Sequence, residues 1–278
     1  MRSRKPCVGS LLFLISLIER VLSKNKAILI NCSFQYENYR HFSNVLALQT
    51  ILLKNGYPKE NISVFIKENI LKNTRNPFKH LCIGNDMVHR REIAETPQRS
   101  SSYFDILNMI AGEDPVMEGA DQDTNLLIYI TGHGGDGFIK HCNREYLYTA
   151  DITSALIRLQ AVRRLKSVLF ISDTCQSDTL VDVSALPDNV FFVSTSLKGE
   201  SSHSSEFNCD LNIFPIDLFV MHLYTLDRKG VVAKYNDFSL FVKDHMPPSL
   251  LYSTVTVHRP FCISDFLYHR KGNSSLYL

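Results

Sequence analysis

The sequence of 278 residues contains no tryptophan and no large excess of either charge. Its 30 Lys and Arg residues against 28 Asp and Glu give a formal net charge of +2, without a basic stripe. Because nucleic-acid-binding proteins usually carry a basic patch, no nucleic-acid partner is expected. The large core side chains must come from 17 Phe and 12 Tyr, and 45% hydrophobic residues are typical of a globular domain.

Long hydrophobic runs are also missing. The apolar run at Val8–Ile18 has 11 residues, whereas a helix needs ~20 to span a bilayer. Basic residues precede this run, and Val21 and Ser23 have the spacing that signal peptidase prefers. We therefore predict a secretory signal at 1–23 and a single lumenal domain at 24–278; a buried N-terminal helix is the disfavoured alternative.

Cysteine is too sparse for a disulfide scaffold, although pairs could form in an oxidising lumen. Removal of the signal with Cys7 leaves Cys32, Cys82, Cys142, Cys175, Cys209 and Cys262. Glycosylation sequons begin at Asn31, Asn61 and Asn273. Because Asn31 ends a predicted buried strand, only Asn61 and Asn273 are expected to be accessible.

Short β-branched runs alternate with helical patterns, and there are no repeats or low-complexity linkers. Strands are predicted at 26–32, 62–66, 126–131, 167–172, 190–194 and 253–257. Helices are predicted from Ser43, as cap, to Gly56, from Ser101 or Ser102 to Ala111, from Asp151, and near 215–227 and 236–245. Residues 138–148 favour a hairpin and 67–100 a long loop. The βαβα order predicts an α/β fold with a mostly parallel central sheet sandwiched by helices.

Two of the predicted central strands end in reactive side chains. "NLLIYITGHGGDGFIK" (125–140) places His133 among four glycines, and "VLFISDTCQ" ends with Cys175 close by. Sites in open α/β sheets lie beyond the carboxyl ends of such strands, so the pair predicts a general base and a nucleophile. Glycines lose much backbone entropy on folding, so this cluster implies a sharp turn or a close approach.

An oxyanion hole is a second use for the glycines. The backbone N–H groups of Gly134, or its neighbour, and of Cys175 can point at the oxyanion of a tetrahedral intermediate. The alternatives are that Cys175 is a small buried hydrophobe and that "GHGG" is only a turn. The order of His before Cys, about 40 residues apart, matches the spacing in caspases and favours catalysis.

The blocks "IYITGHGGDGFIK" and "LFISDTCQ" closely resemble the legumain-like cysteine peptidase family, and within it the GPI-anchor transamidases. Four further stretches agree in order: "ENYRH" (37–41), "TRNP" (74–77), "VSTSLKGESSHS" (193–204) and "TVHRPF" (256–261). The resemblance covers most of the mature chain. It implies a caspase-like or legumain-like fold.

The resemblance assigns roles to individual residues. It implies His133 as general base, Cys175 as nucleophile, and Asn38 of "ENYRH" as the residue that orients the histidine. It also implies that Asp173, Ser194, Thr195 and Ser196 line the pocket for the substrate residue at the cleavage site. The alternatives are that Asn38 closes the turn after the first strand and that the three hydroxyls serve strand packing.

The chain departs from the family in three places. "DTCQSD" replaces the small residues that relatives often carry after Gln176, and the chain ends soon after the "HR" block, where many relatives have a transmembrane helix. Positions that hold calcium in relatives match Lys59, Val88 and Arg90, which could not bind it. A zinc site from His133, His141, Cys142 and His203 lacks any recognised ligand spacing. We therefore expect no metal and no cofactor.

The resemblance implies an acyl transfer. Cys175 would cleave the C-terminal signal of a proprotein after a small residue and pass the acyl group from a thioester to the phosphoethanolamine amine of a GPI lipid. It implies membrane subunits of a transamidase complex as partners, in the endoplasmic reticulum lumen. A lumenal cysteine endopeptidase and a non-catalytic scaffold of the same fold remain the alternatives.

Overall fold

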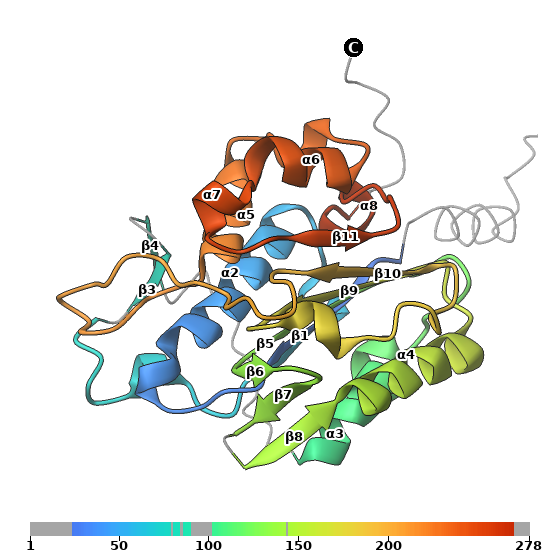
Figure 1. Ribbon diagram of the computed structural model, residues 1–278, viewed down its shortest axis with the longest axis horizontal. Coiled ribbons are helices and arrows are strands. Elements are labelled where there is room, and N and C mark those ends of the chain that lie inside the picture. Colours follow the sequence, from blue (N-terminus) through green and yellow to red (C-terminus); the bar gives the residue numbers. More distant parts are fainter. Residues whose placement is uncertain (1–23, 79, 84–85, 90–101, 143, 270–278) are drawn as a thin grey trace, which may run out of the picture.

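The computed structural model describes residues 24–78, 80–83, 86–89, 102–142 and 144–269. The predicted signal at 1–23 and the sequon at Asn273 lie outside these residues. One six-stranded sheet forms the centre, in the spatial order β11-β10-β9-β5-β1-β2. Five strands are parallel, and β11 runs antiparallel to β10 at one edge (Figure 1).

The strands of the sheet match the continuous apolar runs of the sequence. They are β1 (Lys26–Asn31), β2 (Ile62–Phe65), β5 (Asn125–Thr131), β9 (Ser167–Asp173), β10 (Val190–Ser194) and β11 (Thr256–His258). Successive residues of β1 face opposite layers, with Ala27 and Leu29 in one core and Ile28 and Ile30 in the other. Because both faces are covered, central strands such as β5 are apolar at almost every position.

Helices cover both faces of the sheet, which confirms the predicted α/β sandwich. They are α2 (Tyr39–Lys54), α3 (Tyr103–Asn108), α4 (Thr149–Arg163), α5 (Leu218–Arg228), α6 (Phe238–His245), α7 (Pro248–Leu251) and α8 (Ser264–Leu267). A π-helical turn at Met109–Glu113 extends α3. Short 3-10 helices occur at Tyr36–Asn38, Lys59–Asn61, Ile70–Lys72, Pro115–Met117, Ser177–Leu180 and Val232–Lys234. The core of α2 and α5 lies on one face, and that of α3 and α4 on the other.

Two small sheets lie beside the main one. The predicted hairpin is confirmed as β7 (Phe138–His141) and β8 (Glu145–Tyr148), which continue a sheet begun by β6 (Gly134–Gly135). The long loop predicted for 67–100 is wrong in part, because it contains a second hairpin, β3 (His80–Ile83) and β4 (Asp86–His89). Each strand of this hairpin is only four residues long, too short to distinguish from a loop in the sequence.

Two predicted boundaries need correction. Helix α2 begins at Tyr39, and Ser43 is fully buried within it rather than capping it. Strand β11 begins at Thr256, three residues later than predicted.

Asn31 is buried and its side chain accepts a hydrogen bond from Ser33 N, 2.8 Å away, as expected for an inaccessible sequon. No helix among the described residues is long and apolar enough to cross a membrane.

Candidate active site

The predicted reactive residues lie at the same edge of the sheet. Strands β5 and β9 are parallel neighbours, and their last paired residues are Thr131 and Asp173. His133 and Cys175 each follow two residues later. The register therefore places the imidazole and thiol segments side by side, beyond the carboxyl ends of the two central strands.

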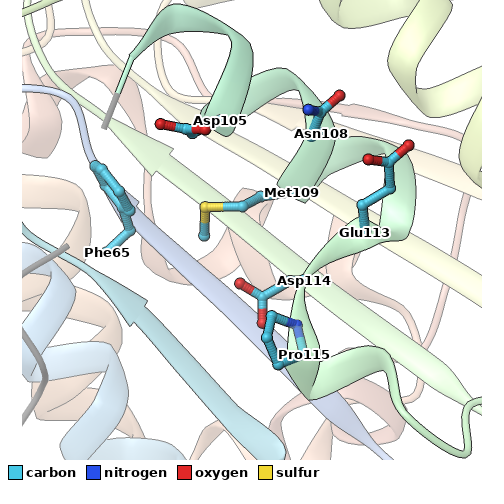
Figure 2. A pocket seen from close by; sticks show the side chains of 7 residues that line it. All are labelled: Phe65, Asp105, Asn108, Met109, Glu113, Asp114 and Pro115. Atoms are coloured by element: carbon cyan, nitrogen blue, oxygen red, sulfur yellow. The ribbon is translucent and has the colours of Figure 1, made fainter. Parts of the chain in front are cut away.

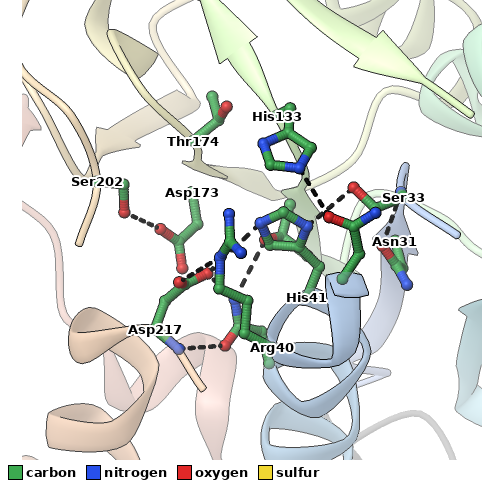
Figure 3. A network of polar contacts seen from close by, with 12 residues as sticks. Asn31, Ser33, Arg40, His41, His133, Asp173, Thr174, Ser202 and Asp217 are labelled. Atoms are coloured by element: carbon green, nitrogen blue, oxygen red, sulfur yellow. Dashed lines mark hydrogen bonds and ion pairs between the residues drawn. The ribbon is translucent and has the colours of Figure 1, made fainter. Parts of the chain in front are cut away.

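The imidazole of His133 is held by Asn38. Its Nε2 lies 2.7 Å from Asn38 Oδ1, while Asn38 Nδ2 donates to Phe34 O at 2.7 Å. The second bond turns the amide oxygen towards the ring, so Nε2 donates and carries the proton of the neutral imidazole. The lone pair of Nδ1 is then available as a base. Figure 3 shows His133 above His41, with the dashed bond from its ring.

The pKa of His133 lies below its usual value. Burial has the largest effect, because it disfavours the charged ring, and the charges of Arg40 and Lys140 lower the pKa further. His41 packs against the same ring, edge to face, with centroids 5.0 Å apart. His133 is therefore neutral and able to accept a proton at neutral pH.

Close approach, rather than a positive φ, explains two of the glycines after β5. A Cβ on Gly134 would lie 2.4 Å from Thr174 Oγ1 and 2.9 Å from Phe138 O. A Cβ on Gly135 would lie 2.7 Å from the ring of Phe138. Only Gly137, with φ of 76°, needs glycine for its backbone conformation. The histidine loop is thus pressed against the cysteine loop and against β7.

The cysteine loop is held firmly behind Cys175. Ser177 Oγ accepts from Thr195 N and Ser196 N, at 2.8 Å and 3.0 Å, and Ser177 N donates to Ser196 Oγ at 3.1 Å. Cys175 itself is half-buried, and its N–H has no acceptor within the described part of the chain. The role of this N–H as an oxyanion donor stays a prediction.

The four predicted pocket residues divide into two groups. Asp173 is buried, and Thr195 Oγ1 donates to its Oδ1 at 2.9 Å. Ser194 and Ser196 bond to the segment around Cys175 instead. Ser196 Oγ donates to Thr174 O at 2.7 Å, and Ser194 Oγ donates to Asp178 Oδ1 at 3.1 Å. Asp173 and Thr195 therefore bond to each other, while Ser194 and Ser196 hold neighbouring segments.

Asp178, part of the unusual "DTCQSD" block, has a second partner. Its Oδ1 lies 2.7 Å from Nε2 of His258 on β11. This contact links the 3-10 helix after Cys175 to the "TVHRPF" stretch. The departure from the family pattern therefore adds a tie across the sheet edge.

Further polar residues surround Asp173 and Asp217. These further residues were not singled out from the sequence. Arg40 Nε lies 3.2 Å from Asp217 Oδ1, and Asn44 Nδ2 donates to Asp217 Oδ2 at 2.6 Å. Ser202 Oγ and Tyr129 OH donate to Asp173 at 3.0 Å and 2.9 Å. Figure 3 shows Arg40, Asp173 and Asp217 converging below His133. Arg40 and Asn44 share a helix face, which was a readable signal, whereas Asp217 carries no local signal.

Both buried carboxyls have raised pKa values. Burial raises the pKa of Asp173, although hydrogen bonds from Tyr129, Thr195 and Ser202 oppose it. Burial and the neighbouring charge of Asp173 raise the pKa of Asp217 to about 7, against the attraction of Arg40. Burial thus favours the neutral form of both carboxyls.

Two sets of residues were weighed from the sequence as metal ligands and set aside. No group of three or more His, Cys, Asp and Glu side chains in the described ranges could hold a metal ion. His141 and Cys142 are buried neighbours, and His203 contacts Tyr252 instead. Of the positions matched to calcium ligands, Lys59 begins a 3-10 helix, Val88 lies in β4, and Arg90 is outside the described residues.

Four other cysteines in the described ranges are free thiols. Cys32 and Cys142 are buried, and burial raises the pKa of both thiols. Cys209 is exposed and Cys262 half-buried, and all four are free thiols.

A separate cavity of about 420 Å³ lies beside the turn that follows α3 (Figure 2). Its carboxylates are already bonded: Asp105 accepts from Ser102 N, Glu113 pairs with Arg158, and Asp114 accepts from Ser63 Oγ and Val116 N. None of the residues that line it belongs to the His133 or Cys175 segments.

These features define an α/β protein with a caspase-like sheet and a histidine and a cysteine at adjacent strand ends. The chain resembles caspase-1 from Spodoptera frugiperda, with a TM-score of 0.53 and 11% identity, over 90% of this chain and 92% of that one. At this identity the likeness concerns the fold alone. Residues 25–226 match the Peptidase C13 family, and the chain belongs to that family.

The curated relatives bear a common name. The GPI-anchor transamidases of Schizosaccharomyces pombe and Saccharomyces cerevisiae are each 29% identical, over 75% and 78% of this chain. The human GPI-anchor transamidase is 25% identical over 84% of this chain. The matches cover 59%, 55% and 61% of these relatives, so the chain spans little more than half of their length.

Proposed function

We propose that the protein is the catalytic subunit of a GPI-anchor transamidase, with Cys175 as nucleophile, His133 as base and Asn38 as its positioning residue. The observation that carries the proposal is the ring of His133, fixed by Asn38 Oδ1 at 2.7 Å, on the strand next to that of Cys175. The names of the relatives support the choice of transamidation over simple hydrolysis.

The first half of the reaction forms a thioester. His133 Nδ1 takes the proton of the Cys175 thiol, and Sγ attacks the carbonyl carbon of the small residue that precedes the signal. The N–H groups of Gly134 and Cys175 stabilise the resulting oxyanion. The C–N bond then breaks, and His133 returns its proton to the leaving amine of the hydrophobic tail.

The second half regenerates the thiol. The phosphoethanolamine amine of a GPI lipid attacks the thioester carbonyl and gives a proton to His133. The C–S bond breaks, an amide forms, and the proton passes to the cysteine sulfur. Water at ~55 M competes for the same thioester, so the site must position the amine, and effective molarities of ~10⁵ M or more make this possible.

A pocket beside Cys175 receives the small residue. We assign Asp173 and Thr195 to its wall, with Ser194 and Ser196 holding the segments behind it. The hydroxyl donors on Asp173 keep its carboxylate satisfied without substrate. A short side chain fits such a wall without displacing these bonds. A longer one would displace some of them, and a buried acceptor left unpaired costs ~1–3 kcal/mol.

The location follows from the same proposal. The segment 1–23 would direct the chain to the endoplasmic reticulum lumen and be removed, leaving 24–278 as one catalytic domain. Membrane subunits of a transamidase complex would hold it near its substrates, which are proprotein C-terminal signals and GPI lipid.

Hydrazine tests the acyl transfer. As a small nucleophile it should enter without the lipid and yield a C-terminal hydrazide on a proprotein with a small residue at the cleavage site. Cys175→Ala and His133→Ala should abolish this product, whereas Cys209→Ala, at an exposed thiol remote in sequence, should not. Circular dichroism of each variant checks that the fold is intact.

Two results would contradict the proposal and favour one of the alternative functions. Release of free carboxylate alone, with GPI lipid or hydrazine supplied to the native complex, would identify an endopeptidase. Unchanged turnover in a folded Cys175→Ala variant would leave only a scaffold.

A further inference from the structure

The outward face of the β7–β8 hairpin is aromatic. Phe138 is paired across the strands with Tyr148, and Lys140 with Tyr146. The alternate residues Ile139 and Leu147 are buried, so the first four side chains share the opposite face. The uncovered face of an antiparallel pair is normally polar.

Three of these rings form a continuous surface. Phe138 and Tyr146 have centroids 5.2 Å apart, and Tyr146 and Tyr148 stack at 6.2 Å with an interplanar angle of 21°. Tyr146 is 39% exposed and Tyr148 53% exposed. Contiguous exposed aromatic side chains are typical of a recognition surface.

The surface adjoins the candidate active site. Lys140 N donates to His133 O at 2.7 Å, and the ring of Phe138 packs on Gly135. The Lys140 ammonium lies 5.9 Å from the centroid of Tyr146 and forms no ion pair with any described residue. Its charge is also near enough to depress the pKa of His133. Lys140 thus lies near Tyr146, and its charge reaches the imidazole of His133.

This order of groups fits one component of the reaction. Aromatic rings stack on the apolar faces of sugars, and their hydroxyls suit a wet surface. A lysine ammonium binds phosphate as a point charge. In a GPI acceptor the phosphate lies between the reacting amine and the sugar that carries it.

We propose that Lys140, Tyr146 and Tyr148 form the acceptor-binding surface, which binds the phosphoethanolamine-bearing sugar of the GPI glycan. The inference rests on the proposed function. Lys140 contacts the phosphate, the two tyrosines contact the sugar, and the amine then reaches the thioester carbonyl at Cys175. The tail of the peptide substrate is a poorer occupant, because its polar spacer of ~8–12 residues spans roughly 26–40 Å when extended.

Direct binding tests the surface. The full-length Cys175→Ala protein, purified in its native assembly, is titrated with a lipid-free glycan fragment carrying mannose and terminal phosphoethanolamine. Calorimetry should show binding that Tyr146→Ser with Tyr148→Ser weakens at least tenfold. Val162→Ser, at a 64% exposed apolar residue of α4, is the control and should bind unchanged.

Lysine variants separate the phosphate from the sugar. Lys140→Gln should weaken binding of the phosphorylated fragment about tenfold and leave binding of the fragment without phosphate unchanged. Lys229→Gln, at an exposed lysine after α5, should alter neither.

Three results would overturn the acceptor surface. These are no binding of the fragment, equal binding by the tyrosine variants, or an effect of those variants confined to adsorption on phosphatidylserine vesicles. Hydrazide formation by the active enzyme, measured in parallel, separates this failure from failure of the proposed function. If hydrazide forms while any of the three results holds, only the acceptor surface is wrong.

Discussion

The hydrogen bond from His133 to Asn38 gives the most specific test of the proposed mechanism. Asn38→Ala removes the acceptor 2.7 Å from Nε2 and leaves the ring free to turn or to adopt the other tautomer. An unpaired buried donor costs ~1–3 kcal/mol, and ~1.4 kcal/mol corresponds to a factor of ten. We expect kcat/KM for hydrazide formation to fall about 10- to 100-fold, less than the loss in Cys175→Ala.

Asn38→Asp distinguishes positioning from simple packing. A carboxylate also accepts from Nε2, but it stabilises the charged imidazole, so the lowered pKa of His133 should rise. Since the neutral ring is the base, the acidic limb of the kcat/KM profile should move to higher pH, by about one unit for ~1.4 kcal/mol. Activity at alkaline pH should recover relative to Asn38→Ala.

The reasoning fails under either of two measurements. Full kcat/KM in Asn38→Ala would show that the amide does not hold the base. An acidic limb that stays fixed in Asn38→Asp would show that His133 is not the titrating group. Thermal unfolding of both variants controls for the loss of the bond to Phe34 O.

Three further predictions concern groups near the site. In a Cys209→Ala background, iodoacetamide at neutral pH should modify Cys175 far faster than the buried Cys32 and Cys142, as followed by mass spectrometry; equal rates would refute it. Thr174→Val should leave the free energy of unfolding in urea unchanged or higher, because the buried Oγ1 has no partner among the described residues, and a loss above ~1 kcal/mol would contradict this. The folded protein holds the proton of Asp217 to about pH 7 and the unfolded chain releases it near 3.8, so stability from this group is lost as pH rises between these values. Asp217→Asn cannot lose stability in this way, so its free energy of unfolding minus that of wild type should be higher at pH 8 than at pH 4. The same difference at both pH values would refute the raised pKa of Asp217.

The sequence predicted the sheet because the central strands are covered on both faces. Strands such as β5 and β9 are buried along most of their length and therefore read as unbroken apolar runs. The position of the candidate site was readable for a related reason, since residues after parallel strands collect at one edge. To place His133 beside Cys175, it was enough that the strands before them are neighbours in the sheet.

The start of α2 was mispredicted because one side chain serves another purpose. Asn38 occupies the position before the helix, where asparagine is a favoured cap, but it makes no capping bond. Its amide instead joins His133 to Phe34 O. The local rule fails there because the tertiary contact takes the group that would otherwise cap the helix.

Asp217 lay beyond sequence reasoning for a different reason. It precedes α5, far along the chain from both strand ends, and only the packing of α2 brings it to Arg40 and Asn44. The sequence predicted a last strand at 253–257 but not its place at the edge of the sheet, because the short antiparallel pairing of β11 depends on β10 rather than on its own residues.

The pocket beside Cys175 combines two buried carboxyls with a single cation, and this balance bears on the residue it accepts. Asp173 is bonded by three hydroxyls, and Asp217 by Asn44 and Arg40. A long substrate side chain would have to break some of these bonds, at ~1–3 kcal/mol for each group left unpaired. A cationic side chain would gain from the carboxylates but would lie against Arg40, and an anionic one would lie against two acids. Under the proposed function, the polar saturation of this wall, rather than an apolar fit, would select a small uncharged residue at the cleavage site.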